Sequence, residues 1–227
     1  MASEFPRSPK LLKGALAVYE GQTPGTQPQQ IIVFQYNPDQ VRRTLARRAP
    51  PADASERGAA REDALRVPGP PVESISLSVY LDAADQLAEP SQNQGIVENG
   101  LHPALATLEM MLYPPTLRLQ QNERLAQQGE VQLSPQELPL VLLVWGRSRV
   151  VPVMLSSFSV SEEAFDPELN PIRAKVDLGL RVLTYVELPA ETLGRDAFLA
   201  YQRRKESLAG EYRNGRGEDR IRGLLPA

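Results

Sequence analysis

The feature that most constrains the fold is a long run of alternating side chains at residues 173–185. Every second position of this run is small or branched and apolar: Ala174, Val176, Leu178, Leu180 and Val182. Four of the positions between them are charged: Arg173, Lys175, Asp177 and Arg181. Because successive side chains of a strand point to opposite faces, the run predicts a β-strand with one apolar and one polar face. It exceeds the usual strand length of about 5–6 residues, which suits a sheet that extends across a subunit boundary.

Residues 72–82 repeat this pattern in the first half of the chain. One face holds Ile75, Leu77, Val79 and Leu81, and the other holds Ser74, Ser76, Ser78 and Tyr80. Shorter strands are expected at residues 13–19, 30–36, 41–48, 138–145, 150–155 and 157–165. Pro152 indicates an edge strand or a bulge, because proline cannot donate to a ladder. Residues 30–36 are apolar on both faces, so that strand needs cover on both sides, in a closed barrel or at a subunit contact.

Helices are expected to flank these strands. Residues 103–113 carry an apolar stripe after a proline that suits a first helical turn, and residues 189–207 form a second helix. Residues 117–128 indicate a weaker helix or an extended loop. The predicted fold class is therefore mainly β with flanking helices (α+β).

Composition divides the chain into one core and three appendages. Residues 11–188 are expected to form the β domain, and residues 1–10 a mobile arm. Within the domain, residues 49–71 are rich in Pro, Ala, Arg and Glu and are interpreted as a flexible insertion. Residues 189–227 combine the last helix with a basic tail.

Several classes of function find no support in the sequence. The chain has no cysteine and one histidine, which argues against a Cys/His zinc site, and no cofactor motif is present. A net charge of −3 gives no argument for binding to nucleic acid. The start of the chain lacks the apolar core of a secretory signal, and no apolar run reaches about 20 residues, so we expect synthesis in the cytosol and no membrane insertion.

Catalysis is the weaker interpretation of the titratable residues. His102 stands at a predicted helix start, where a cap or surface position is the usual role. A glycosidase carboxylate pair could be drawn from Glu162, Glu163, Asp166 and Glu168, but these residues also suit a solvated loop. The basic cluster consists of Arg42, Arg43, Arg47 and Arg48. Because it lacks interleaved aromatics, a solvated face or ion pairs with a neighbouring subunit are favoured over nucleic acid. We therefore expect a structural protein and not an enzyme.

Ordered motifs across residues 10–188 carry a resemblance to a known family. They read KLLKGALAVYE at 10–20, IIVFQYNPD at 31–39, ESISLSVYLD at 73–82, HPALATLEMMLYPP at 102–115, PLVLLVWG at 139–146 and EEAFDPELNPIRAKV at 162–176. In this order they resemble the tube proteins of contractile injection systems, which are phage-tail-like particles. The nearest likeness is to the tube-initiator or baseplate adaptor subunit, although no LysM-like segment follows residue 188.

The resemblance implies a tail-tube-like β-barrel or sandwich that assembles into a ring, commonly a hexamer. It implies a position between the spike or hub and the inner tube, beside other baseplate subunits, in a particle assembled in the cytoplasm and released by lysis in some systems. The polar faces of residues 72–82 and 173–185 would then line a channel. We expect subunit contacts or channel positions at Phe34, Tyr36, Asn37, Pro38, Phe165, Asn170, Pro171, Arg173, Lys175 and Arg181. The alternative is a monomeric binding module for cell-wall glycan or for another tail protein.

Overall fold

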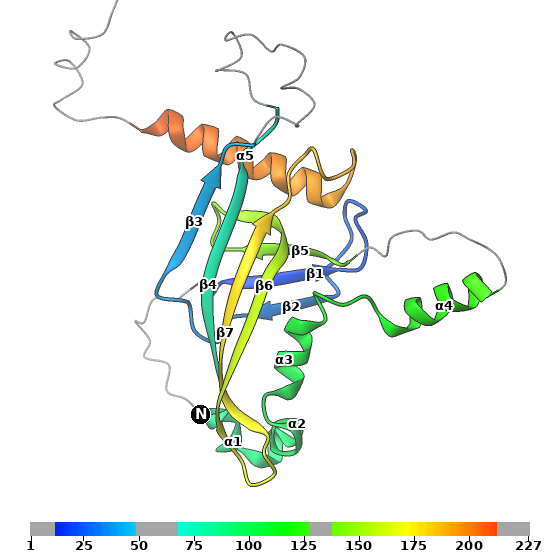
Figure 1. Cartoon of the computed structure of the whole chain (residues 1–227). Coiled ribbons are helices and arrows are strands. Elements are labelled where there is room, and N and C mark those ends of the chain that lie inside the picture. Colours follow the sequence, from blue (N-terminus) through cyan, green and yellow to red (C-terminus); the bar gives the residue numbers. More distant parts are fainter. Residues whose placement is uncertain (1–11, 49–67, 128–137, 213–227) are drawn as a thin grey trace, which may run out of the picture.

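The structure is a computed structural model that describes residues 12–48, 68–127 and 138–212. The expected arm at residues 1–10, most of the expected insertion at 49–71 and the end of the basic tail lie outside these residues. The described residues form an antiparallel sheet of seven strands with helices around it, which confirms the mainly β fold class (Figure 1).

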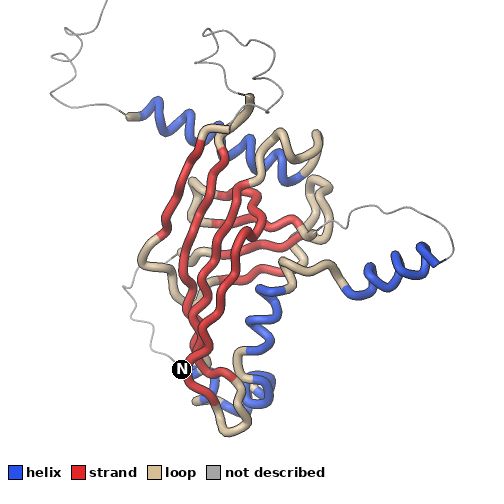
Figure 2. The backbone as a smooth tube through the Cα atoms, viewed as in Figure 1, coloured by secondary structure: helices blue, strands red, loops and turns tan. Residues whose placement is uncertain are grey.

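The sheet has the strand order β2-β1-β5-β6-β7-β4-β3. The strands are β1 (Ala15–Tyr19), β2 (Gln30–Val33), β3 (Val41–Ala46), β4 (Val72–Asp82), β5 (Leu140–Val144), β6 (Val150–Phe165) and β7 (Pro171–Val182). In Figure 2 the sheet has two parts. Strands β3, β4, β6 and β7 run lengthwise, and β1, β2 and β5 cross behind them. The two outer strands, β2 and β3, are not paired with each other, so the sheet is open and does not close into a barrel.

The two alternating runs form the centre of the lengthwise part. β4 occupies the predicted residues, and its register with β7 places Leu77 opposite Leu178 and Val79 opposite Val176. These four side chains are at most 5% exposed, and they pack in the same core as Leu16 and Leu143 of the crossing strands. Burial of the apolar face thus holds the two parts of the sheet together.

The expected strands at residues 150–155 and 157–165 are one continuous strand, β6, with a bulge between Leu155 and Ser157. Of the two alternatives for Pro152, the edge is wrong, because β6 lies between β5 and β7, and the bulge of this strand lies three residues beyond the proline. The Pro152 carbonyl accepts a hydrogen bond from Leu183 N–H at 2.9 Å, one residue beyond the end of β7. The N–H and C=O of one residue in an antiparallel strand point to the same side of the strand. The N–H that Pro152 lacks would therefore also point toward the residues that follow the end of β7.

β2 is shorter than the expected strand at residues 30–36. Ile32 is half-buried and Phe34 is buried, but Ile31 and Val33 remain 58% and 55% exposed. The second apolar face of this edge strand is therefore not covered by described residues of the same chain.

Helices cover the ends of the sheet. Two helices stand close to their predicted positions, α3 (His102–Glu109) and α5 (Leu193–Glu211), and residues 117–128 resolve as helix α4 (Thr116–Gln127). The polar stretch after β4 holds α1 (Ala84–Leu87), a 3-10 turn (Pro90–Gln92) and α2 (Gln94–Asn99). α5 lies across one end of the long strands, and α1 and α2 lie at the other, beside the turn between β6 and β7 (Figure 1). None of the helices in the described ranges is long and apolar enough to cross a membrane.

Candidate functional site

The most extensive candidate surface is the polar side of the four lengthwise strands, here called the polar face. Its members, aligned by the registers of the strands, are Arg42 and Thr44 of β3; Ser74, Ser76, Ser78 and Tyr80 of β4; Ser157, Ser159, Ser161 and Glu163 of β6; and Arg173, Lys175, Asp177 and Arg181 of β7. Small hydroxyl side chains fill its centre, and Tyr80, 45% exposed, is its one large aromatic.

Polar contacts between neighbouring strands fix the side chains of this face. The Ser78 hydroxyl donates to the Asp177 carboxylate, and Lys175 Nζ lies 3.2 Å from Asp177 Oδ1. The hydrogen bond from Ser78, followed by the contact with Lys175, holds the pKa of Asp177 below its usual value. At the far end of the strands, Arg173 binds Asp82 with an N–O distance of 3.0 Å. The face is therefore charged but internally balanced.

The middle of the polar face is hollowed. The depression has a volume of about 560 Å³ and is lined by Arg42, Ser76, Tyr80, Ser157 and Asp177, among others. Pro38, one of the predicted contact residues, stands at its border. A wide, open and hydroxyl-rich depression offers hydrogen bonds without an apolar pocket, which suits contact with water or a passing polar surface better than retention of a small ligand.

Two strand edges border the polar face. β3 pairs with β4 on one side, and no described residue pairs with its other side. β6 pairs with β5 only as far as Val153, so its outer edge from Ser157 onward has no ladder partner within the described ranges. Unpaired strand edges are templates for another strand, and these two lie at opposite sides of one four-stranded layer.

The predicted contact residues near residue 34 hold the fold of the subunit itself. Phe34 is 1% exposed and packs on Trp145, with ring centroids 6.4 Å apart. Asn37 Oδ1 accepts from Gly14 N–H at 2.8 Å, and its Nδ2 donates to the Leu12 carbonyl at 3.1 Å. Tyr36 of this group is exposed, at 51%.

The predicted residues near residue 170 build the turn between β6 and β7. Asn170 N–H donates to Asp166 Oδ1 at 2.7 Å, and its side-chain amide donates to Asp166 Oδ2 at 2.8 Å. The Pro171 carbonyl accepts from Leu101 N–H at 2.8 Å, which ties the turn to the start of α3. Phe165 is 49% exposed. Hydrogen bonds from Asn170, chiefly that of its side chain, keep the pKa of Asp166 below its ordinary value.

The three predicted basic residues of β7 all lie on the polar face. Arg173 is bound to Asp82 and Lys175 to Asp177, while the Arg181 guanidinium donates to Glu187. Burial acts to raise the pKa of Glu187, but the hydrogen bonds from Arg181 and Thr184 hold it below its usual value. The structure thus brings these three residues together on one surface, whereas Phe34 lies in the core.

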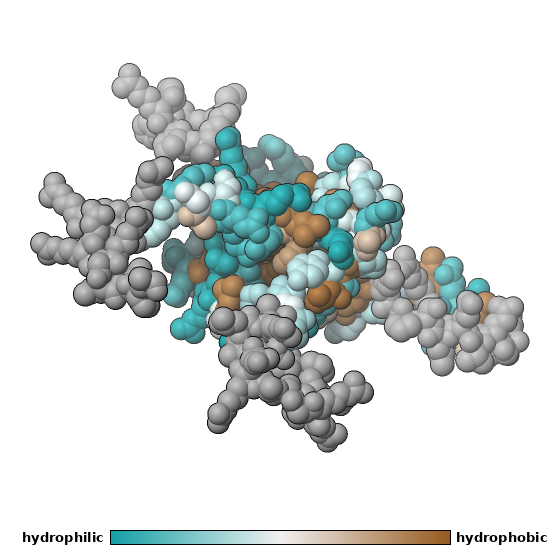
Figure 3. All heavy atoms as spheres, turned by 90° about the horizontal axis from the view of Figure 1, so that it is seen from above, coloured by the Kyte–Doolittle hydropathy of each residue, from teal (hydrophilic) through white to brown (hydrophobic). Residues whose placement is uncertain are grey.

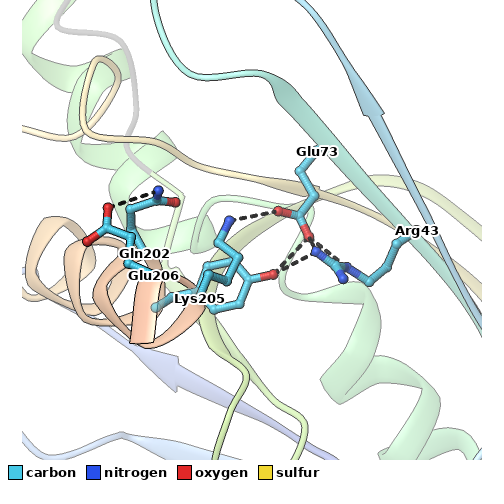
Figure 4. Close-up of polar contacts among 6 residues, drawn as sticks. Arg43, Glu73, Gln202, Lys205 and Glu206 are labelled. Carbon is cyan, nitrogen blue, oxygen red and sulfur yellow. Dashed lines mark hydrogen bonds and ion pairs between the residues drawn. The ribbon is translucent and has the colours of Figure 1, made fainter. Parts of the chain in front are cut away.

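A buried ionic network at the α5 end was missed by the sequence reasoning. Glu73 is 4% exposed and accepts from Arg43 at 2.6 and 2.8 Å and from the Tyr201 hydroxyl at 3.1 Å. Figure 4 shows Arg43 of β3 and Lys205 of α5 approaching Glu73 from different sides, and Lys205 Nζ lies 4.0 Å from Glu73 Oε2. Burial, reinforced by the Glu73 charge, raises the pKa of Tyr201, and burial lowers the pKa of Lys205.

A signal for this network was present in the alternation of β4. Glu73 is in phase with Ile75, Leu77 and Val79, so the pattern itself places a carboxylate on the apolar face. A carboxylate in that position requires a cation or several donors, because an unpaired buried charge is costly. Its partners Tyr201 and Lys205 lie more than a hundred residues away in sequence, and no local pattern predicts that they contact Glu73.

The weaker candidates are dispersed. Arg43 joins Glu73 and Arg48 lies 3.7 Å from Glu187, so two members of the predicted basic cluster form ion pairs within the subunit. Asp166 of the predicted acidic set is occupied by the turn hydrogen bonds. Within the described residues no group of three His, Asp or Glu side chains is placed to hold a metal ion. His102 stands exposed at the start of α3.

Comparison with known proteins gives one family. The family described as contractile injection system tube protein matches residues 10–186, which covers most of the chain and all seven strands. A comparison with curated proteins gives no match.

Proposed function

The chain belongs to the contractile injection system tube protein family, and from this premise we propose that it is a ring-forming subunit whose polar face lines the central channel. The family supports a structural role within the injection particle. The proposal adds the geometry of the ring, its place in the particle and the absence of catalysis.

The observation that carries the proposal is the polar face. Four adjacent strands present Ser, Thr and paired charges on one side, while the opposite side of the two central strands, β4 and β7, is buried in the core. The strands of this face are long, its side chains are mostly small hydroxyls and paired charges, and Tyr80 is its one large aromatic. In a channel, such a face would form a hydrated wall, and cargo would pass it without apolar contacts that retain it.

The free edges of β3 and β6 support a lateral contact between subunits. Pairing the β3 edge of one copy with the β6 edge of the next would continue one sheet from subunit to subunit. Each contact of that kind joins two different patches, so a rotation that closes produces a ring and pairs the free edges of β3 and β6. The resemblance to tail-tube subunits supports six copies.

The position of the ring follows from the finer resemblance. The segments FQYNP at 34–38 and FDPELNPIRA at 165–174 resemble the tube-initiator or baseplate adaptor subunit. We therefore place the ring between the spike or hub and the inner tube, beside other baseplate subunits, in a particle assembled in the cytoplasm. Within the subunit these segments shape the core around Phe34 and the β6–β7 turn.

The lateral contact can be tested with engineered disulfides, because the natural sequence contains no cysteine. Thr44→Cys on β3 is combined in turn with Ser157→Cys, Ser159→Cys and Ser161→Cys on β6. Oxidation of the purified full-length protein, or of assembled particles, is followed by non-reducing electrophoresis. We expect one pairing to give a ladder of crosslinked copies that ends at six.

Matched controls exclude random collisions. Each single cysteine should stop at a dimer, and Ile31→Cys on the exposed β2 edge combined with Ser159→Cys should give no ladder. If every β3–β6 pairing in intact particles gives no product above a dimer, the ring contact proposed here is wrong. A folded monomer that never enters particles would favour the binding-module alternative.

A further inference from the structure

Helix α4 (Thr116–Gln127) stands away from the body of the molecule, on the side of the lengthwise strands on which β6 lies (Figure 1). Seen from above, the same arm is separate from the sheet and carries apolar side chains among hydrophilic ones (Figure 3). Among its described side chains only Asn122 is half-buried, and the others are exposed. Pro114 and Pro115 precede the helix and, because proline fixes its own φ, they restrict the directions in which the helix can leave α3.

A helix of this kind needs a surface on which to pack. α4 has 12 residues, and isolated helices shorter than about 12–15 residues are only marginally stable in water. Leu117 and Leu125 are 65% and 39% exposed, and because they are about two turns apart they lie on the same side of the helix. No described residue of the same chain buries either leucine. This side of α4 is therefore open to a second chain.

The edge strand β2 carries the matching surface. Ile31 and Val33, here called the β2 patch, lie on the face of the crossing strands that is turned away from Phe34 and the main core, and both are more than half exposed. The register places Ile31 opposite Ala17 of β1, and on that same face α5 packs against Ala17. The cover that α5 gives to this face stops before β2, so the β2 patch is an apolar surface without a partner among the described residues.

The two surfaces lie at opposite sides of the molecule. β2 runs toward the side on which β3 lies and ends there at Val33, whereas α4 projects on the side of β6 (Figure 1). A lateral contact between β6 of one copy and β3 of the next therefore also brings α4 of the first copy toward the β2 patch of the second. At about 1.5 Å per residue α4 is roughly 18 Å long, close to the width of four strands, so it can cross the boundary between the copies.

We propose that α4 of each copy is an arm that packs on the β2 patch of the next copy, with Leu117 and Leu125 against Ile31 and Val33. The proposal rests on the ring proposed above, but the two contacts differ in kind. Pairing of β3 with β6 joins backbone edges, whereas the arm buries apolar side chains on the face opposite the polar face. In a closed ring each arm and each β2 patch is covered once.

Disulfide crosslinking tests which surface the arm meets. Leu125→Cys is combined with Val33→Cys in the full-length protein, which has no natural cysteine, and oxidation is followed by non-reducing electrophoresis. We expect a ladder of crosslinked copies that ends at the size of the ring. Glu123→Cys with Val33→Cys is the matched control and should give at least about tenfold less product, because Glu123 lies on the other side of α4. Equal products from the two pairs, or a disulfide confined to the monomer, overturn the proposal.

Self-association of the purified protein, measured by sedimentation velocity over a range of concentrations, tests the energetic link. Serine at both leucines, Leu117→Ser with Leu125→Ser, should weaken association at least about tenfold, since their burial is lost. Ile31→Ser with Val33→Ser should act alike, and all four changes together should add little, because both pairs remove the same contact. Unchanged association in the α4 variant, whose changes touch no buried residue, or full additivity of the two pairs overturns the proposal.

The outcome can be separated from that of the ring. Leu169→Ser changes an exposed leucine of the turn between β6 and β7, outside both contacts, and should leave association unchanged. A β3–β6 ladder without an α4–β2 ladder would keep the ring and refute the arm. An α4–β2 ladder without any β3–β6 product would support the arm and refute the pairing of those two edges.

Discussion

The two ends of the long strands differ in how an energetically unfavourable residue is accommodated. At the α5 end, Glu73 is buried, and Arg43, Tyr201 and Lys205 turn their polar atoms toward it. At the other end, in the turn between β6 and β7 (residues 165–171, here called the tip), Leu169 is 76% exposed and holds a positive φ, with its N–H donating to the Asp166 carbonyl at 3.0 Å. The contacts at the α5 end offset the free energy cost of burying Glu73, so its residues contribute to the stability of the fold. At the tip, the hydrogen bonds of the turn hold Leu169 in this conformation, but its side chain gains little burial.

The largest expected effect tests the α5 end. Arg43→Ala should lower the free energy of unfolding by roughly 2–3 kcal/mol, because removing one member of a buried pair leaves the other charge uncompensated. The expected loss is below the usual range of about 3–5 kcal/mol since Arg43 is partly exposed and Lys205 remains nearby. Urea unfolding followed by circular dichroism measures it.

Arg42→Ala is the matched control, because it removes the same side chain one position earlier in β3, from the polar face. It should change the free energy of unfolding by less than about 0.5 kcal/mol, the usual range for an exposed position. Equal losses in the two variants would show that the Glu73 network does not distinguish the α5 end, and the contrast between the ends would fail.

The next effect has the opposite sign. Leu169→Asn should raise the free energy of unfolding by about 0.5–1 kcal/mol, because asparagine tolerates the left-handed conformation and little burial is lost. Thermal unfolding at low protein concentration measures the change, since dissociated protein reports the fold alone.

Leu117→Asn is the control for this prediction. Leu117 is 65% exposed and lies in ordinary helical backbone at the start of α4, so its replacement should not stabilise the fold. A Leu169→Asn variant less stable than the unmodified protein would mean that the leucine side chain contributes to the fold, and the tip would no longer differ in kind from the α5 end.

The sequence predicted those parts of the fold that depend on a local period. β4 and β7 followed from alternation alone, because one face of each is buried along most of its length. The division of β6 into two strands was wrong because a bulge at Leu155 and Ser157 interrupts the alternation without interrupting the strand. The short helices between Ala84 and Asn99 were missed because each is too short and polar to show a helical period.

The candidate surfaces divide in the same way. The polar face could be predicted, since its residues alternate with the core residues of the same strands. The partners of Glu73 could not, because Tyr201 approaches from a helix whose packing direction is a property of the whole fold. The importance of Leu169 was also hidden, since a leucine in the segment FDPELNP gives no sign that its φ is positive.

The smallest expected effect is the loss of stability of the fold at low pH. Glu187 near α5 and Asp166 in the tip both have lowered pKa values in the folded protein. A carboxyl whose folded pKa is depressed adds stability that is fully present above its unfolded pKa and is lost as the pH falls through the folded pKa. The free energy of unfolding should therefore be level above about pH 5.5 and decline below about pH 4.5. Glu187→Gln and Asp166→Asn should each flatten that decline.

Salt distinguishes the two ends in this experiment. The main stabilising contact of Glu187 is the Arg181 cation, whereas Asp166 is held foremost by the neutral amide of Asn170. Urea unfolding between pH 3.5 and 7 in 20 and 500 mM NaCl should therefore show that salt reduces the effect of Glu187→Gln and leaves that of Asp166→Asn nearly unchanged. An equal salt response in both variants would mean that charge pairing supports the tip as it supports the α5 end. The two ends would then be held by the same kind of contact, and the difference between them would rest on Leu169 alone.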